Sequence, residues 1–375
     1  MNYKPLSIFL ITLVTGAICL LPSCVNDPKE KKQEVDRTPL LEDLADNVII
    51  PGYTWYHTSA FALQEGIAKF VESPNEENLL EARDRFVQAY HQWQSVAFFD
   101  FGPAFTHTLR ANVNTFPTDN FSIDNAIAAG TIELDKISAQ NKKGFPAIDY
   151  LLYGTEETAA EVVAQYTTDE HAENRKAYLK AVADDIFNKT DQVYNSWLPA
   201  SGDYRATFVS KNGTDVGSSL GQMVNSLSQY FESVTRDAKI GIPLGKRSQG
   251  VAIPRNAEAY YSGLSISLAS ENLKAIKNFF EGKFAQNSGD GLYDYLKSLN
   301  SQFNGQLLAD AILDQLELAE NKTSAIPTPF TETVNSNPTP ADEAYSELQK
   351  LVVLIKVDMA SALGVLITYQ DNDGD

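Results

Sequence analysis

Repeated amphipathic helical stripes constrain this chain more than any other feature of its sequence. The segment 76–97 places Leu79, Phe86, Tyr90 and Trp93 on one helical face. Comparable stripes occupy the ranges 178–197, 220–234, 273–280, 308–316 and 345–363. Helices with one apolar face bury it against one another, so the pattern predicts an all-α fold. No stretch alternates apolar and polar residues for long, so we expect no substantial sheet.

The chain supplies more long helices than one four-helix bundle uses. We therefore expect two tandem four-helix-bundle-like domains, the first over residues 39–200 and the second over residues 201–375. The boundary is weakly marked, and the segment 199–213, which contains glycine, serine and asparagine, is the best candidate for the linker.

The first residues have the pattern of a targeting segment. Lys4 precedes an apolar run over 6–21, and the run ends in the sequence LPSC at Cys24. We interpret residues 1–23 as a lipoprotein signal peptide, Cys24 as the lipidated residue, and residues 24–38 as a solvated tether. The alternative is an ordinary secretory signal with a chance cysteine. The lipoprotein interpretation predicts a cell-envelope protein, anchored by lipid to the outer membrane or the periplasmic face.

The charge of the chain limits its partners. Its 49 acidic and 30 basic residues give a formal net charge of −19. Such a chain repels phosphate backbones, so nucleic acid is not expected as a partner. Cations are the natural counterpart, although an acidic surface that only keeps the protein soluble explains the composition equally well.

Six short blocks, in order along the chain, carry a resemblance to a known family. They are DNVIIPGY at 46–53, TFPTD at 115–119, GFPAIDYLLYG at 144–154, GIPLG at 241–245, EAYYSG at 258–263 and DNDGD at 371–375. Together they resemble imelysin-type proteins from about residue 41 to residue 375. The resemblance implies a two-bundle helical fold and a role in bacterial iron uptake, and the family takes its name from a peptidase activity.

The family signature G-x-H-x-x-E, a candidate metal site, is altered in this chain. Gly144 is kept, Pro146 replaces the histidine and Asp149 replaces the glutamate. Proline offers no lone pair to a metal, but it suits the first turn of a helix. The resemblance therefore makes Asp149 the candidate metal ligand, with Gly144 and Pro146 shaping its turn. The lost histidine argues against an enzyme.

Other catalytic patterns are also missing from the sequence. The four histidines form no H-E-x-x-H motif, and the mature chain keeps no spare thiol. A zinc peptidase would need ligands brought together from distant positions. The metallopeptidase nevertheless stays open as an alternative function.

Two further loops contain candidate ligand-binding residues. Asp119 is a second candidate metal ligand beside Phe116, although it also stands where a helix N-cap is expected. Arg247, Glu258 and Tyr260 form a basic and aromatic group that suits an anionic ligand, although an interdomain contact explains them as well. We expect these loops to converge near the junction of the two bundles.

The function that these observations favour is binding in the uptake of iron, another metal or haem. Iron, calcium and haem are the ligands considered. A second alternative is an interaction scaffold that presents its surface to an outer-membrane transporter.

Overall fold

The structure is a computed structural model, and it describes residues 35–154 and 158–369. Contacts divide the chain into two units, Met1–Asp36 and Arg37–Asp375, and the buried core lies entirely in the second. The predicted signal peptide, Cys24 and most of the tether lie outside the described residues, as does the block 371–375. Within the described residues, no helix combines the length and apolar character that a membrane crossing requires.

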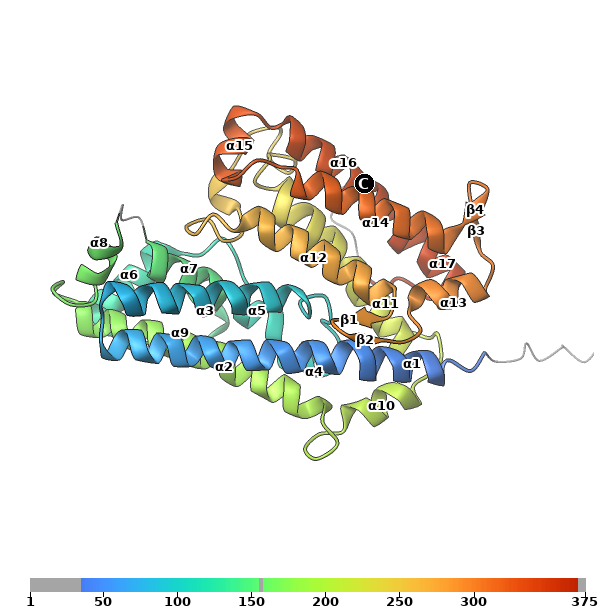
Figure 1. The fold of residues 1–375 in the computed structure, drawn as a ribbon, viewed down its shortest axis with the longest axis horizontal. Coiled ribbons are helices and arrows are strands. Elements are labelled where there is room, and N and C mark those ends of the chain that lie inside the picture. The colour runs from blue at the N-terminus through green and yellow to red at the C-terminus, as the bar shows by residue number, and fades with distance from the viewer. Residues whose placement is uncertain (1–34, 155–157, 370–375) are drawn as a thin grey trace, which may run out of the picture. The chain divides into compact units, whose positions relative to one another are not determined.

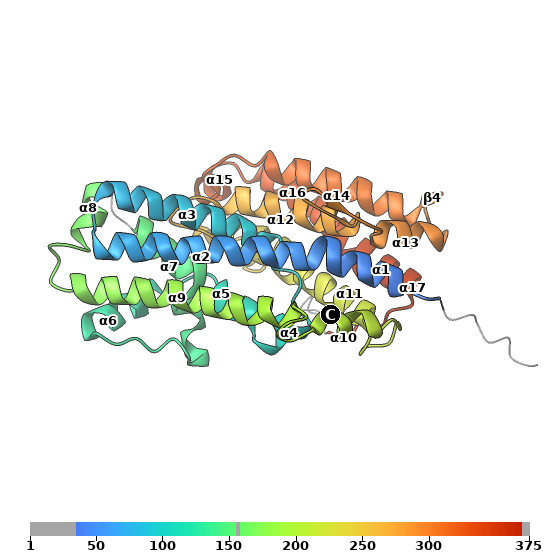
Figure 2. The same cartoon turned by 60° about the horizontal axis from the view of Figure 1, so that its bottom comes forward.

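The first half of the Arg37–Asp375 unit begins with a continuous helical rod. The helices in this half are α1 (Thr38–Leu44), η1 (Ala45–Ile49), α2 (Ile50–Glu72), α3 (Glu76–Gln94), α4 (Gly102–Thr106), α5 (Leu109–Val113), α6 (Asn120–Ala129), η2 (Ile137–Lys142), α7 (Gly144–Tyr153), α8 (Ala159–Ala164), α9 (Ala172–Trp197) and α10 (Tyr204–Ser210). Helices α1, η1 and α2 join without a break, and α2 packs against both α3 and α9 (Figure 2). Their apolar stripes meet in the core, where Trp93 and Trp197 are each 1% exposed.

The second half is also helical, with two small hairpins. Its elements are α11 (Ser219–Tyr230), η3 (Phe231–Gly241), η4 (Pro254–Asn256), α12 (Ser265–Phe280), β1 (Lys283–Phe284), β2 (Asn287–Ser288), α13 (Leu292–Ser298), β3 (Gln302–Phe303), β4 (Gln306–Leu307), α14 (Leu308–Ser324), α15 (Phe330–Ser336), α16 (Thr339–Val353), η5 (Leu354–Met359) and α17 (Ala360–Leu363). Strand β1 pairs antiparallel with β2, and β3 pairs antiparallel with β4. These two-residue strands leave the predicted all-α class unchanged.

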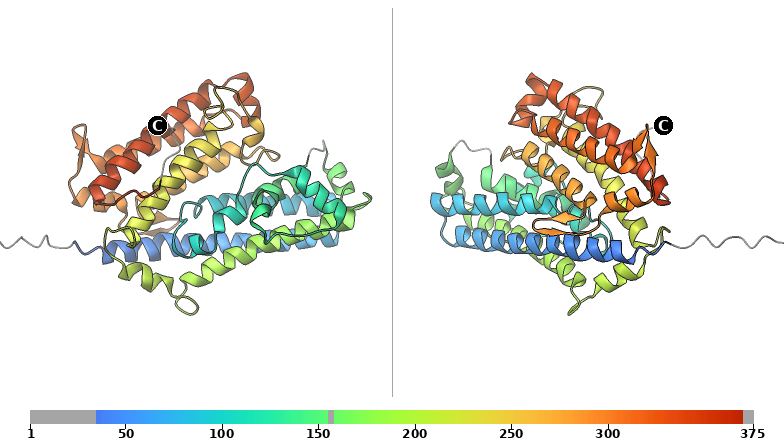
Figure 3. Two further views of the ribbon diagram at one scale, coloured as in Figure 1. Left: turned by 180° about the vertical axis from the view of Figure 1, so that it is seen from behind. Right: turned by 45° about the vertical axis from the view of Figure 1, so that its right-hand side comes forward.

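Helices α12, α14 and α16 form the second packed layer. Figure 1 shows α14 and α16 side by side, with α12 next to α14, and Figure 3 shows the same group from behind and from the side. Helix α12 also contacts α3, so the two halves share one continuous core. The all-α prediction is confirmed, while the division into bundles at residue 200 stays a prediction.

One helix of the second half carries charge into the interior. Helix η3 has π-helical hydrogen bonding over its 11 residues. It continues α11 and packs against α16 and α12. Glu232, Arg236, Asp237 and Lys239 on η3 are all buried. Buried charges require partners, and the partners of these four position the loops described next.

Candidate functional site

Three of the segments predicted to carry function meet at one small cavity, which we call the loop cavity. Its walls are formed by Phe116, Pro117, Thr118, Pro146, Asp149, Arg255, Ala257, Ala259, Tyr260 and Tyr261. Its volume, measured for the centre of a water molecule, is about 10 Å³, which is room for roughly one water. The structure therefore brings together four predicted residues, namely Phe116, Pro146, Asp149 and Tyr260. Asp119, Gly144, Arg247 and Glu258 do not line this cavity.

Gly144 brings the start of α7 close to the end of α5. Its φ of 75° lies in the left-handed region, and a Cβ added there would lie 2.4 Å from the carbonyl oxygen of Val113. Only glycine fits this approach. Pro146 follows in the first helical turn and is buried, a position where the missing N–H costs no helical hydrogen bond. Both residues therefore shape the first turn of α7, while their part in ligand binding stays a prediction.

Asp149 ties α7 to the loop that precedes α12. Its side chain is buried, with the residue 1% exposed. The backbone N–H of Tyr261 donates to Oδ2 at 2.9 Å, and that of Ser262 donates to Oδ1 at 3.0 Å. Each carboxylate oxygen thus already has a main-chain partner. These contacts explain Asp149 without a metal, so its role as a metal ligand stays a prediction.

Burial also sets the acidity of this carboxyl group. Desolvation raises the pKa of Asp149 to about 6, because a buried carboxylate loses its hydration. Hydrogen bonds from Ser262 and Tyr261 oppose the rise in this pKa, and the charge of nearby Glu258 adds to it. Asp149 is therefore an acid that changes its protonation close to neutral pH.

Asp119 has the structural role that its position in the sequence also allowed. It is the N-cap of α6, with Oδ1 accepting from the Ser122 backbone N–H at 3.0 Å and Oδ2 from the Ser122 hydroxyl at 2.7 Å. The Ser122 hydrogen bonds hold the pKa of Asp119 below its usual value. Across the described residues, no group of three or more His, Cys, Asp or Glu side chains is placed to hold a metal ion.

Glu258 lies at the centre of a buried polar cluster. It pairs with the ammonium of Lys239 and accepts hydrogen bonds from the side-chain amides of Asn114 at 2.8 Å and Gln94 at 3.3 Å. The Lys239 ammonium also donates to Oε1 of Gln94 at 2.9 Å. Burial lowers the pKa of Lys239, an effect that the charge of Glu258 opposes. The cluster joins η3, α3, the end of α5 and the loop before α12.

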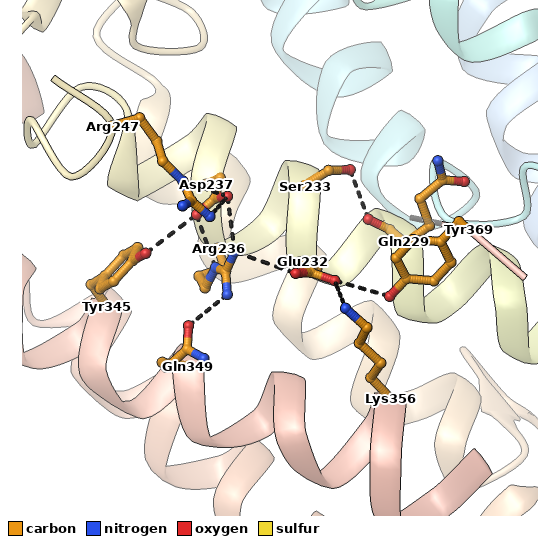
Figure 4. Close-up of polar contacts among 10 residues, drawn as sticks. All are labelled: Gln229, Glu232, Ser233, Arg236, Asp237, Arg247, Tyr345, Gln349, Lys356 and Tyr369. Atoms are coloured by element: carbon orange, nitrogen blue, oxygen red, sulfur yellow. Dashed lines mark hydrogen bonds and ion pairs between the residues drawn. The ribbon is translucent and has the colours of Figure 1, made fainter. Parts of the chain in front are cut away.

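Arg247 belongs to a different charged cluster, shown in Figure 4. Its Nη2 lies 2.7 Å from Oδ2 of Asp237. Arg236 contacts the same carboxylate and donates from Nε to Oδ1 at 2.8 Å and from Nη2 to Oδ2 at 2.9 Å. Further along η3, Lys356 donates to Glu232 at 2.9 Å. This ion pair connects η3 to η5, and a hydrogen bond from Arg236 to Oε1 of Gln349, at 2.5 Å, connects η3 to α16. Arg247 therefore pairs with a carboxylate of its own half of the chain, not across the predicted junction, and it does not line the loop cavity with Tyr260. Its part in ligand binding stays a prediction.

The aromatic side of the loop cavity is made of tyrosines. Tyr260 is 39% exposed, and its ring lies edge-on to Tyr261 with centroids 5.0 Å apart. Tyr261 in turn contacts Tyr150, at 5.1 Å between centroids. No described residue makes a hydrogen bond to the phenol oxygen of Tyr260 or Tyr261. Two phenol groups therefore remain available beside Asp149.

The residues that sequence reasoning missed are Lys239, Gln94 and Asn114. The segment 235–241, TRDAKIG, carries three charged residues and reads as a solvated helix end. It is buried because η3 continues α11 and is covered by α12 and α16. No local pattern marks Gln94 or Asn114 as partners of Glu258, because the three residues are distant in sequence.

The packed helical layers define an all-α protein. The chain belongs to the imelysin family, whose profile matches residues 49–356.

Individual relatives agree with this assignment. The chain is 25% identical over 304 residues to iron-regulated protein A of Synechococcus elongatus, covering 77% of this chain and 76% of that protein. A solved structure described as an iron-regulated protein A precursor from Parabacteroides distasonis superposes with a TM-score of 0.72 at 21% identity, covering 90% of this chain and 97% of that one. An imelysin-like protein from Psychrobacter arcticum gives a TM-score of 0.61 at 19% identity, with coverage of 89% and 97%.

Proposed function

We propose that this chain is a lipid-anchored envelope protein that binds iron at the loop cavity and serves iron acquisition. The observation that carries the proposal is the meeting of Asp149, Tyr260 and Tyr261 at one cavity whose polar side chains offer mainly oxygen. The names of the relatives, iron-regulated protein A, direct the choice of ligand toward iron.

The donor set at the cavity suits a hard cation. Carboxylate and phenol oxygens are hard donors, and tyrosine is a known protein ligand of iron. The phenols of Tyr260 and Tyr261 face no competing hydrogen bond from a described residue, while Asp149 holds their loop in place. Arg255 brings positive charge to the same wall, which suits an anion that accompanies the metal.

The size of the cavity distinguishes a metal ion, such as iron or calcium, from haem as the ligand. At about 10 Å³ for a water centre, it has room for one ion or one water but not for a haem. We therefore commit to a single metal ion, with iron ahead of calcium because phenol donors favour iron.

The metallopeptidase alternative receives less support from the same residues. A catalytic zinc site takes about three ligands, usually including histidine, and keeps one open position. None of the four histidines lines the loop cavity. Zinc-dependent cleavage of an unfolded protein, lost on Asp149→Ala, is the result that would favour this alternative.

The binding test uses the chain from Val25 onward, which keeps the complete Arg37–Asp375 unit. Ferric iron is supplied as its nitrilotriacetate chelate, and binding is followed by calorimetry and by visible absorbance. A tyrosine phenolate bound to ferric iron gives a visible charge-transfer band, so we expect this band to appear and Tyr260→Phe to weaken it.

The matched control is Tyr293→Phe, which removes a half-buried phenol on α13 that donates to Asp310. This variant should bind iron as the unmodified chain does. The proposal is wrong if iron gives neither heat nor a visible band, or if Tyr260→Phe and Tyr261→Phe both leave binding unchanged.

Anchoring is tested separately, because Cys24 lies outside the described residues. Cys24→Ala should abolish labelling by a radioactive fatty acid and release the protein from the membrane fraction. If the interaction scaffold were the correct function, an outer-membrane transporter would co-purify with the chain while the iron titration stayed flat.

A further inference from the structure

A second concave surface lies between α2 and α3, apart from the loop cavity, and we call it the α2–α3 groove. Its volume is about 630 Å³, within the range of pockets that hold drug-sized molecules. Trp55 lies on its α2 wall and Arg85 on its α3 wall, and neither residue lines the loop cavity. Nothing in the proposed iron function uses this groove.

The α2 wall contains threonine as well as apolar residues, but its threonine hydroxyls are not free to bind a ligand. The hydroxyls of Thr54 and Thr58 donate to the backbone oxygens of Ile50 and Thr54, both at 2.8 Å. Because these hydroxyls are already bonded to the helix, the threonines add no free donor to the groove. Ala62 continues this wall, and Val87 faces it from α3, where the polar side chains of Gln88, His91 and Gln92 also line the groove.

Trp55 marks one end of the groove. It is 52% exposed, whereas Trp93 and Trp197 are each 1% exposed. The Trp55 ring is held edge-on by Phe284 from strand β1, with centroids 5.6 Å apart and planes at 86°. A large aromatic ring that is positioned by a neighbour and left open to solvent suits stacking against a planar ligand.

Arg85 marks the other end of the groove. Its aliphatic stem crosses Gly66 of α2, where an added Cβ would lie 3.0 Å from Cγ of Arg85. No hydrogen bond or ion pair to its guanidinium exists among the described residues, and nearby Glu81 is taken by Lys69 at 2.6 Å. In a chain with a formal net charge of −19, a cation without a protein partner at the end of this groove suits an anionic group.

We propose that the α2–α3 groove binds an elongated organic acid with a planar apolar body. The body lies along Ala62 and Val87 and stacks on Trp55, while its acid group pairs with Arg85. Trp55 and Ala62 are seven residues apart on α2, which corresponds to about 10 Å along the helix axis. The ligand is therefore longer than a single ring.

Two fluorescent probes that share one scaffold test the proposal on the chain from Val25 onward. Anilinonaphthalene sulfonate carries an acid group, and phenylnaphthylamine is the same ring system without it. We expect both to bind in the groove, the sulfonate more tightly, because only the sulfonate pairs with Arg85.

The variants separate the two ends of the groove. Arg85→Gln should weaken the sulfonate about three- to tenfold, the range for a partly exposed charged contact, and leave phenylnaphthylamine unchanged. Trp55→Ala should weaken both probes. Lys297→Gln is the matched control, because it removes an exposed cation 4.9 Å from the Tyr293 ring on α13, and it should change neither affinity.

Circular dichroism and thermal unfolding establish that each variant is folded before its affinity is compared. The proposal is overturned if Arg85→Gln weakens both probes equally, or if Trp55→Ala changes neither. It is also overturned if the chain forms a dimer that Trp55→Ala dissociates and that excludes both probes, because the groove would then be an interface between copies.

Discussion

Breaking the buried ion pair between Lys239 and Glu258 should destabilise the protein strongly. Both side chains are 1% exposed, and Glu258 also satisfies the amide groups of Asn114 and Gln94. Glu258→Gln would leave the Lys239 ammonium buried with Gln94 as its remaining partner. Lys239→Met would leave a buried carboxylate with two neutral donors. Each single change therefore leaves one uncompensated charge in the core.

The size of the effect follows from the burial. Removing one partner of a buried pair costs about 3–5 kcal/mol. Unfolding entropy of about 2.1 cal/mol/K per residue over the Arg37–Asp375 unit converts each kcal/mol to about 1.4 °C. Each single variant should therefore lower Tm by about 4–7 °C. The double variant Lys239→Met with Glu258→Gln should lose less than the two single losses together, since no buried charge remains.

Scanning calorimetry of the four proteins measures this coupling. Glu81→Gln is the control, because it breaks the ion pair between Lys69 and Glu81, which spans 2.6 Å on the solvent-exposed side of α3. This control should leave Tm unchanged. If Glu258→Gln and Lys239→Met behave like the control, or if their losses simply add in the double variant, the reasoning about an interior pair is refuted.

Three further predictions concern single residues at the site. Gly144→Ala should lower stability by about 2 kcal/mol or more, measured by urea unfolding, because the left-handed backbone and the Val113 carbonyl both exclude a Cβ. Burial raises the pKa of Asp149 to about 6 in the folded chain. The folded state therefore holds the carboxyl proton more tightly than the unfolded state does. The stability that this proton contributes is complete below about pH 4 and is lost as pH rises through 6. A plot of Tm against pH should show this loss, of about 3 kcal/mol, and Asp149→Asn should remove it. Asp119→Ala should cost about 0.5–2 kcal/mol of stability through the lost helix cap and leave the iron titration unchanged. A change in iron affinity would instead make Asp119 a ligand.

The sequence predicted the helical class because a packed helix shows a local, periodic pattern of apolar residues. Stripes such as Leu79, Phe86, Tyr90 and Trp93 are all buried in α3, as a single apolar face requires. The burial of η3 is not visible in any such local pattern. Its charges at Arg236, Asp237 and Lys239 are buried by helices that are distant in sequence, and local patterns cannot supply that information.

The candidate site was predictable in part, for the same physical reason. Phe116, Pro146, Asp149 and Tyr260 were chosen because they break the helical pattern or match the family blocks, and all four line the loop cavity. Arg247 and Glu258 were grouped with Tyr260 because they are close in sequence. The structure separates them, since Arg247 pairs with Asp237 and Glu258 pairs with Lys239. Which partner a charged residue chooses depends on tertiary contacts.

The contacts of Asp149 change what the altered family motif means for function. Its carboxylate holds the backbone of Tyr261 and Ser262 against α7, so it fixes where the neighbouring phenols point. Pro146 lies one turn earlier in α7 and lines the same cavity without offering a donor. In the family motif, a histidine and an acid are the candidate metal ligands. In this chain, different residues would share that task. The acid positions the loop, and the phenols of Tyr260 and Tyr261 are the groups that a ligand in the cavity would meet. Substituting Asp149 should then change stability and affinity together, whereas substituting Tyr260 should change affinity alone.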